Sequence, residues 1–272
     1  MWVVGGGPIH FFNGVSWRIQ VENLEDETLD VSAADPTHVW ASGGDGRGAV
    51  YFFDGACWSK QFETADETIK VLSAADPRHV WAFGSGESGS NIYFFDGHSW
   101  NLQHSTAVHF QDAIALDPSH VWAVGEKADG GSGIYFFDGR AWEEQYAAPH
   151  GVLLLGVTAA DRKHAWAVGS RGGVSSQGED SPARPGIILY YDGNSWLRQH
   201  KTAIELHRAS AADPSHVWAS GGIGAEGPIY FFDGASWRLQ YDAGEALFDV
   251  SAAGPSHAWA VGGLGGIFVY EP

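Results

Sequence analysis

The chain contains very little sulfur: of its 272 residues, one is a cysteine and one is a methionine. A single cysteine, Cys57, excludes an internal disulfide framework, and we interpret it as structural. No long apolar run is present, so we expect no membrane insertion. No signal peptide opens the chain, which begins inside a repeat. The compartment stays open: cytoplasmic as the chain stands, or secreted if a leader was removed.

Basic residues are scarce. Fifteen Lys and Arg residues stand against 33 Asp and Glu residues, which gives a formal net charge of −18 at pH 7. Such a charge opposes binding to a phosphate backbone or an anionic membrane surface. We therefore expect no nucleic-acid partner and consider a glycan or a protein as the ligand.

Motifs for cofactor chemistry and catalysis are also missing. The glycine-rich segments lie between two predicted strands, and no helix follows them, so they do not form a phosphate-binding loop. No nucleophile stands beside a base in any recognisable pattern. We expect no cofactor, and a binding protein rather than an enzyme.

What the chain does contain is a repeated segment. The stretch "HVWASGGDGRGAVYFFDGACW", residues 38–58, recurs in related forms along nearly the whole chain. The acidic or amide residue at its turn falls at Asn13, Asp54, Asp96, Asp138, Asp192, Asp233 and Glu271, with spacings of 41, 42, 42, 54, 41 and 38. A period in the low forties indicates a repeat architecture.

Each full repeat predicts four short strands, which we call a to d; in one repeat they are residues 206–213, 216–221, 228–234 and 236–240. Strand c is a continuous apolar run, so both of its faces are covered. The b–c and c–d connections are too short for a helix, which makes the strands an antiparallel meander. We therefore predict an all-β fold, a β-propeller of four-stranded antiparallel blades, with residues 1–272 as a single domain.

The number of blades follows from counting strands. Strands b and c occur seven times, whereas a and d occur six times, because the N-terminal repeat lacks a and the C-terminal repeat lacks d. We predict seven blades, two of them three-stranded. In the six-bladed alternative, "HAWAVGGLGGIFVY" would superimpose on "MWVVGGGPIHFF" and leave one hairpin free for a strand-exchanged oligomer.

The thirteen tryptophans all belong to strands b and d. Regularly spaced large aromatics mostly pack cores, so we interpret them as packing between blades. The repeated Asp-Pro-x-His segments suit type I turns that begin strand b, and we interpret their aspartates and histidines as structural.

The run "HVWAVG…GxIYFFDGxSW" resembles the repeat of bacterial propellers related to the Asp-box (BNR) group. In that group a carboxylate, a glycine and a tryptophan fold the hairpin between the third and fourth strands. The resemblance implies that the "DGxSW" turns are structural and lie away from any active site. Asp-box sialidases use three clustered arginines, and here Arg208 alone is expected near the channel mouth, so a sialidase is not expected.

The functional signal is expected where the repeat varies. The a–b and c–d turns have constant length, whereas the b–c loops vary in length and the d–a loops vary in sequence. Loops on a rigid scaffold carry recognition, so we predict the ligand site on the face formed by these variable loops. The candidate ligand-binding residues are Asp30, Lys70, Asp112, Arg171, Gln177, Glu179, Asp180, Arg184, His207, Arg208 and Asp249.

Three function classes stay open. The first is a lectin-like carbohydrate-binding propeller with several weak sites, which would use the outer-strand glutamines; they are Gln20, Gln61, Gln103, Gln145, Gln199 and Gln240. The second is a protein-interaction scaffold that uses the acidic variable face. The third is a hydrolase or lyase at the channel mouth. Metal binding is undecided, because five histidines of the d–a region would have to converge; they are His104, His109, His150, His200 and His207.

Overall fold

The computed structural model describes residues 1–22, 27–172 and 184–271. The chain divides into two compact units, residues 1–121 and 122–272, which are treated separately below. The described residues form strands and turns, and they include no helix that could cross a membrane.

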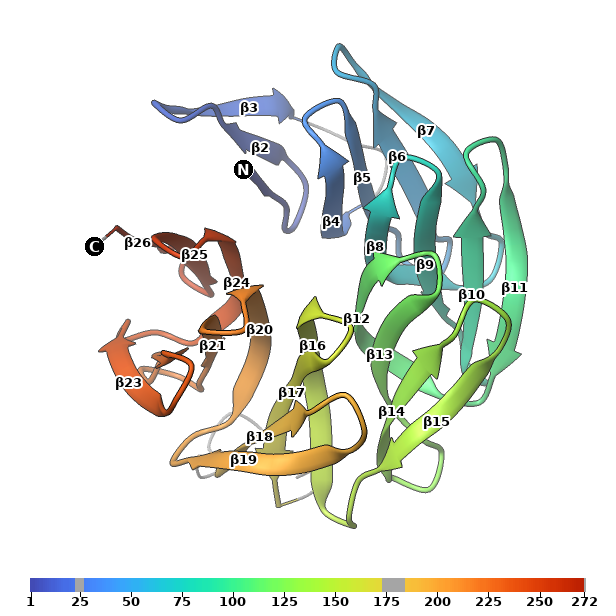
Figure 1. The fold of residues 1–272 in the computed structure, drawn as a ribbon. Coiled ribbons are helices and arrows are strands. Elements are labelled where there is room, and N and C mark those ends of the chain that lie inside the picture. The colour runs from blue at the N-terminus through green and yellow to red at the C-terminus, as the bar shows by residue number, and fades with distance from the viewer. Residues whose placement is uncertain (23–26, 173–183, 272) are drawn as a thin grey trace. The chain divides into compact units, whose positions relative to one another are not determined.

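The strands that begin in the first unit follow one another as short meanders (Figure 1). They are β1 (Trp2–Val3), β2 (Ile9–Phe12), β3 (Trp17–Val21), β4 (Thr28–Asp35), β5 (His38–Gly43), β6 (Ala49–Phe53), β7 (Trp58–Glu63), β8 (Thr68–Asp76), β9 (His79–Ser85), β10 (Ser90–Phe95), β11 (Trp100–Thr106), β12 (His109–Asp117) and β13 (His120–Glu126).

The second unit continues the same pattern to the C-terminal end of the chain. Its further strands are β14 (Ser132–Phe137), β15 (Trp142–Ala147), β16 (Val152–Asp161), β17 (His164–Arg171), β18 (Gly186–Tyr191), β19 (Trp196–Thr202), β20 (Leu206–Asp213), β21 (His216–Gly221), β22 (Pro228–Phe232), β23 (Trp237–Asp242), β24 (Leu247–Gly254), β25 (His257–Gly262) and β26 (Ile267–Tyr270).

These strands form seven antiparallel sheets, and the fold is a seven-bladed all-β propeller. Five sheets have four strands, in the orders β4-β5-β6-β7, β8-β9-β10-β11, β12-β13-β14-β15, β16-β17-β18-β19 and β20-β21-β22-β23. The other two, β1-β2-β3 and β24-β25-β26, have three strands each. The first lacks strand a and the last lacks strand d, so the predicted count of seven blades with two incomplete ones is confirmed.

A β-bulge interrupts every c–d strand pair at the same place. In the β22–β23 pair, Ile229 faces Tyr241 and Tyr230 faces Leu239, so Gln240 is an extra residue with no partner. The same shift leaves out the equivalent glutamine in the other five c–d pairs. A bulge changes the direction of a side chain, and in the five complete sheets it turns the glutamine toward the tryptophan of strand b.

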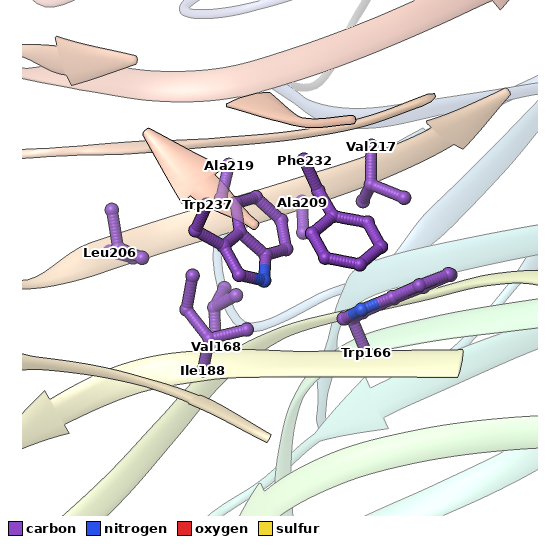
Figure 2. Packing of buried hydrophobic residues seen from close by; sticks show 9 residues of the cluster. All are labelled: Trp166, Val168, Ile188, Leu206, Ala209, Val217, Ala219, Phe232 and Trp237. Carbon is purple, nitrogen blue, oxygen red and sulfur yellow. The ribbon is translucent and has the colours of Figure 1, made fainter. Parts of the chain in front are cut away.

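Those tryptophans form the core between neighbouring blades. The strand-b tryptophans of the five complete sheets are at most 1% exposed; they are Trp40, Trp81, Trp122, Trp166 and Trp218. Trp2 and Trp259, in the two incomplete sheets, are half-buried. Figure 2 shows one such cluster, in which Trp166 and Trp237 lie with aliphatic residues and Phe232 between two adjacent sheets. The prediction that these residues pack between blades is confirmed for this set.

The first strands of adjacent sheets are also joined by hydrogen bonds from backbone to side chain. In four of the five "SAA" or "TAA" segments, the hydroxyl oxygen accepts the N–H of an alanine in the next first strand. The pairs are Ala74 to Ser32 at 3.0 Å, Ala115 to Ser73 at 2.7 Å, Ala211 to Thr158 at 3.1 Å, and Ala252 to Ser210 at 3.0 Å. These bonds fix the relative position of neighbouring blades within each unit.

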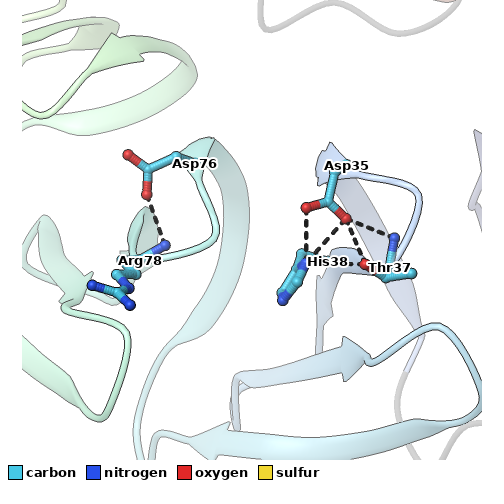
Figure 3. Close-up of polar contacts among 5 residues, drawn as sticks. All are labelled: Asp35, Thr37, His38, Asp76 and Arg78. Carbon is cyan, nitrogen blue, oxygen red and sulfur yellow. Dashed lines mark hydrogen bonds and ion pairs between the residues drawn. The ribbon is translucent and has the colours of Figure 1, made fainter.

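The repeated turns are held by their aspartates. In the c–d turns, Asp54 Oδ1 accepts the N–H groups of Ala56 and Cys57 at 2.8 and 2.9 Å, and the equivalent residues do the same in the other five. In the a–b turns, Figure 3 shows Asp35 in contact with both Thr37 and His38. Both turns thus use a carboxylate to satisfy backbone donors.

These contacts predict how stability depends on pH. The hydrogen bond with His38 is the main reason that the pKa of Asp35 falls to about 2, and the N–H of Cys57 is the main reason that the pKa of Asp54 is lowered. A carboxylate with a lowered folded-state pKa stabilises the fold above its unfolded pKa, and this contribution is lost as the pH falls through the folded pKa. We expect the urea midpoint to fall between about pH 4 and about pH 2. An Asp35→Asn variant should show a shallower fall, and a midpoint that stays constant over this interval would contradict the assignment.

Candidate interaction site

The predicted aspartates are engaged with backbone amides. Asp30 lies in β4 and accepts the N–H of its own neighbour Val31 and, across the blade boundary, the N–H of Leu72, both at 2.7 Å. Asp112 and Asp249 each accept the N–H of the following residue, at 3.0 and 2.8 Å. Asp30 thus joins two first strands, whereas the bonds of Asp112 and Asp249 order the backbone of their own strand.

His207 and Arg208 make similar links in the second unit. His207 Nδ1 lies 2.9 Å from the carbonyl oxygen of Leu247, in the next blade. Arg208 Nη1 donates to Leu155 O at 2.7 Å, in the preceding blade, and to His207 O at 3.0 Å. Desolvation by the surrounding protein raises the pKa of the Asp249 carboxyl, although part of the residue is still accessible to solvent. The nearby Arg208 guanidinium acts in the opposite direction and lowers this pKa. Arg208 and Asp249 are therefore brought into electrostatic contact.

The other predicted ligand-binding residues do not take part in the contacts between first strands described above. Lys70 is exposed on β8, Arg171 ends β17, and Arg184 is half-buried just before β18. Gln177, Glu179 and Asp180 lie outside the described residues.

The five histidines considered for a metal site lie on different elements, four of them in β11, β12, β19 and β20. Within residues 1–22, 27–172 and 184–271, no group of three or more His, Cys, Asp or Glu side chains could hold a metal ion.

The outer-strand glutamines are used inside the fold. Gln61 Oε1 accepts the indole N–H of Trp40 at 3.0 Å and that of Trp100, in the next blade, at 2.9 Å. Gln145 and Gln199 each accept two indoles in the same way, at 2.7 to 3.1 Å. The bulge thus places each of these amide oxygens between two tryptophans. They are not free to serve as repeated sugar-binding groups.

A groove opens in the first unit, on the loops that follow β7, β9 and β11. It has a volume of about 1190 Å³, and its lining includes residues 62–67, 86–91 and 105–107. Four acidic side chains line it, Glu63, Asp66, Glu67 and Glu87, and its lining residues include no Lys or Arg. Its loops are of the d–a and b–c types, so it lies on the predicted variable face.

A buried carboxylate organises the floor of this groove. Glu67 is 6% exposed, and it accepts hydrogen bonds from the Tyr93 hydroxyl and, at 3.2 Å, from Asn91 Nδ2. Gly84 leaves space for it, because a Cβ there would lie 2.2 Å from Glu67 Oε2. Burial, together with the Glu67 carboxylate, raises the pKa of Tyr93. The phenol therefore stays protonated and keeps donating to Glu67.

The sequence contains no clear signal for this network. Tyr93 occupies the same strand-c position as Tyr51, Tyr135 and Tyr230, where the repeat suggests packing alone. Glu67 lies in a d–a loop whose other residues vary among repeats, although Glu245 occupies the same position before a "SAA" run and is also buried. The variation among the loops therefore did not point to these side chains.

Comparison with known proteins finds similar folds among solved structures. No protein-family model and no curated protein matches the chain. Among solved structures, YCF48 bound to D1 peptide is similar over 90% of this chain and 78% of its own, with a TM-score of 0.61 and 18% identity. YCF48 from Cyanidioschyzon merolae matches over 91% and 83%, with a TM-score of 0.58 and 16% identity.

A chain of the mitotic checkpoint complex is similar over 100% of this chain and 83% of its own, with a TM-score of 0.70 and 12% identity. At these identities the likeness shows the fold alone. The comparisons do not show the Asp-box group that the sequence resembles, and they establish this chain as a β-propeller repeat protein.

Proposed function

We propose that this protein is an interaction scaffold that binds a protein partner, with residues 1–272 acting as a single propeller domain. The observation that carries the proposal is the acidic groove of the first unit. Its volume of about 1190 Å³ exceeds the usual range for small-molecule sites, which is about 300–1,000 Å³.

The charge of the groove specifies the chemistry of the partner. Asp66 and Glu87 are exposed, and the chain as a whole carries a net charge of −18. Complementary charge speeds association and selects partners. We therefore expect a partner segment that is rich in lysine and arginine.

The fold comparisons support the same class of function. One similar propeller was solved with a bound peptide, and another belongs to a multiprotein complex. A lectin has less support, since several of the glutamines that would repeat around it accept indole hydrogen bonds. The hydrolase or lyase alternative gains no support from the groove, where the buried carboxylate, Glu67, holds Tyr93 and Asn91 in place.

Neutralising the groove should weaken binding of basic peptides. We expect the double variant Asp66→Asn, Glu87→Gln to lower the affinity for a lysine-rich peptide about three- to tenfold, because each exposed ion pair contributes roughly 0.2–1 kcal/mol. Fluorescence anisotropy with labelled peptides at two salt concentrations would measure this, and the difference should shrink at high salt.

The matched control is Glu143→Gln, Glu226→Gln, which makes the same change in net charge at two exposed positions of the second unit. It should leave the affinity near that of the parent protein. Equal losses in both variants would show that only overall charge matters and would reject the groove. Saturable binding on a glycan array, unaffected by either variant, would favour the lectin.

A further inference from the structure

One carboxylate oxygen in the acidic groove of the first unit has no hydrogen-bond partner. Glu67 lines this groove and is 6% exposed. Its Oε1 accepts from Asn91 Nδ2 and from the Tyr93 hydroxyl, whereas its Oε2 accepts no hydrogen bond from the described residues. Oε2 is not fully covered by protein, so it can be reached from the groove. Because a buried charge is costly unless it is paired, this oxygen marks a place for a cation.

The other carboxylates of the groove add negative charge around this place. Glu63 is already paired with Arg47 and Lys60, with N to O distances of 3.5 and 3.2 Å. Asp66 and Glu87 are exposed, and no Lys or Arg lines the groove. The exposed pair can attract a basic segment from solution, but only the buried carboxylate can hold a cation away from water.

Two aromatic rings line the groove together with this carboxylate. The ring centroids of Phe62 and Tyr93 lie 4.9 Å apart. In the preceding blade, Lys60 places its ammonium 5.5 Å from the ring centroid of Tyr51, and the two residues face each other across the c–d pair. Tyr93 occupies the same strand position but faces Leu102 instead. A strand-c tyrosine can therefore accept an ammonium over its ring, and at Tyr93 that ammonium has to come from another molecule.

The hydrogen bonds of Glu67 also distinguish an ammonium from a guanidinium. A guanidinium binds a carboxylate best through two parallel N–H to O bonds, one to each oxygen. Here Oε1 already accepts two hydrogen bonds, which leaves Oε2 alone for a ligand. An ammonium is a compact charge that needs only one oxygen, and its methylene stem can pack on apolar surface. The free position on Glu67 therefore suits lysine better than arginine.

We propose that the acidic groove contains a pocket for one lysine side chain of the partner, whose ammonium binds Glu67 Oε2 beside the rings of Tyr93 and Phe62. This inference rests on the proposed function, because it takes the groove as the partner site. Asp66 and Glu87 attract basic segments of either kind, whereas Glu67 selects lysine. The partner is thus a basic segment in which one lysine cannot be replaced by arginine without loss of affinity.

Three peptides of equal length test this selection on the unaltered protein. Each has the sequence RGRGXGRGR, in which X is lysine, arginine or acetyl-lysine. We expect the lysine peptide to bind about fivefold more tightly than the arginine peptide, which has the same charge. It should bind at least about tenfold more tightly than the acetyl-lysine peptide, because a hydrogen bond to a charged group corresponds to roughly 10- to 150-fold in affinity. Fluorescence anisotropy with labelled peptides would measure the three affinities.

The Glu67→Gln variant tests whether the selection comes from this carboxylate. The amide keeps one oxygen for Tyr93 and Asn91, which places its NH2 group where Oε2 was. We expect the lysine peptide to weaken about fivefold, to the affinity of the arginine peptide, which itself should change less than about threefold. A urea midpoint close to that of the parent protein would show that the variant is folded.

Glu245→Gln is the matched control. It makes the same change in charge at the equivalent buried position of the last sheet, where Glu245 Oε2 already accepts the N–H of Leu264 at 2.8 Å. This variant should leave all three peptide affinities unchanged.

The ratio of lysine to arginine affinity separates this inference from the proposed function. Asp66→Asn, Glu87→Gln should weaken both peptides alike and leave their ratio unchanged. Equal affinities of the lysine and arginine peptides for the unaltered protein would overturn the lysine pocket but keep the groove as a site for basic peptides. A lysine preference that persists in Glu67→Gln would do the same. If none of the three peptides bound, the groove itself would be rejected, and the pocket with it.

Discussion

Replacing Trp166 by alanine is expected to lower the free energy of unfolding by about 3–5 kcal/mol, the usual cost of removing a buried aromatic side chain. Trp166 has no exposed surface, and it packs against Tyr190 and Phe232 with ring centroids 5.3 and 6.0 Å apart. Its removal leaves a cavity between two blades. Urea denaturation monitored by circular dichroism would measure the loss.

Trp259→Ala provides the comparison for that result. Trp259 occupies the same strand position in the last sheet but is only half-buried. We expect less than half of the loss seen for Trp166→Ala. Similar losses in the two variants would show that burial between blades does not set the contribution of these tryptophans.

The second large effect is expected for Gln199→Leu, a change of similar volume that removes one amide oxygen. Two buried indoles, those of Trp166 and Trp237, would lose their acceptor. An unsatisfied buried donor costs about 1–3 kcal/mol, so the loss of the acceptor for two indoles should cost about 2–6 kcal/mol. Thermal and urea unfolding would both report it.

Other glutamines provide a graded control series. Gln240 accepts one indole, so Gln240→Leu should cost about half as much. Gln20 occupies the same bulge position in β3, but its side chain is exposed, and the nearby Trp58 Nε1 is buried without a partner. Gln20→Leu should therefore have little effect. If all three variants were equally stable, the glutamines would have no structural role.

Much of the fold was predictable because the repeat contains the same information several times. The tryptophans of strands b and d and the aspartates of the turns recur at fixed spacing, so blade boundaries and the two incomplete blades followed from counting. The burial of strand c was also predictable from its continuous apolar run, and Ile92 and Ile134 of two complete blades indeed have no exposed surface.

The glutamine network was not predictable from the same repetition. The glutamines recur at a fixed position in the sequence. Simple alternation of side chains along a strand predicts which face of the sheet Gln199 lies on, but a bulge shifts this alternation by one residue. Only the register shift between Ile188 and Leu189 shows that this side chain turns toward Trp166 and Trp237.

The candidate site was harder still, because it depends on residues that do not repeat. The predicted Asp30 and Arg208 side chains proved to join blades, whereas Glu67 of a d–a loop meets Asn91 of β10, 24 residues away in sequence. Spacing contains no information about such a contact.

The repeated bulge also bears on solubility. Among the described strands, the last strand of each complete sheet pairs on one side only. Flat edges of this kind allow proteins to aggregate by joining sheets between molecules. Here every such strand is bent by its bulge, and most present charged side chains, among them Lys60, Glu143 and Arg198. The residue that holds neighbouring blades together therefore also keeps the outer edges from acting as templates for intermolecular β-sheet.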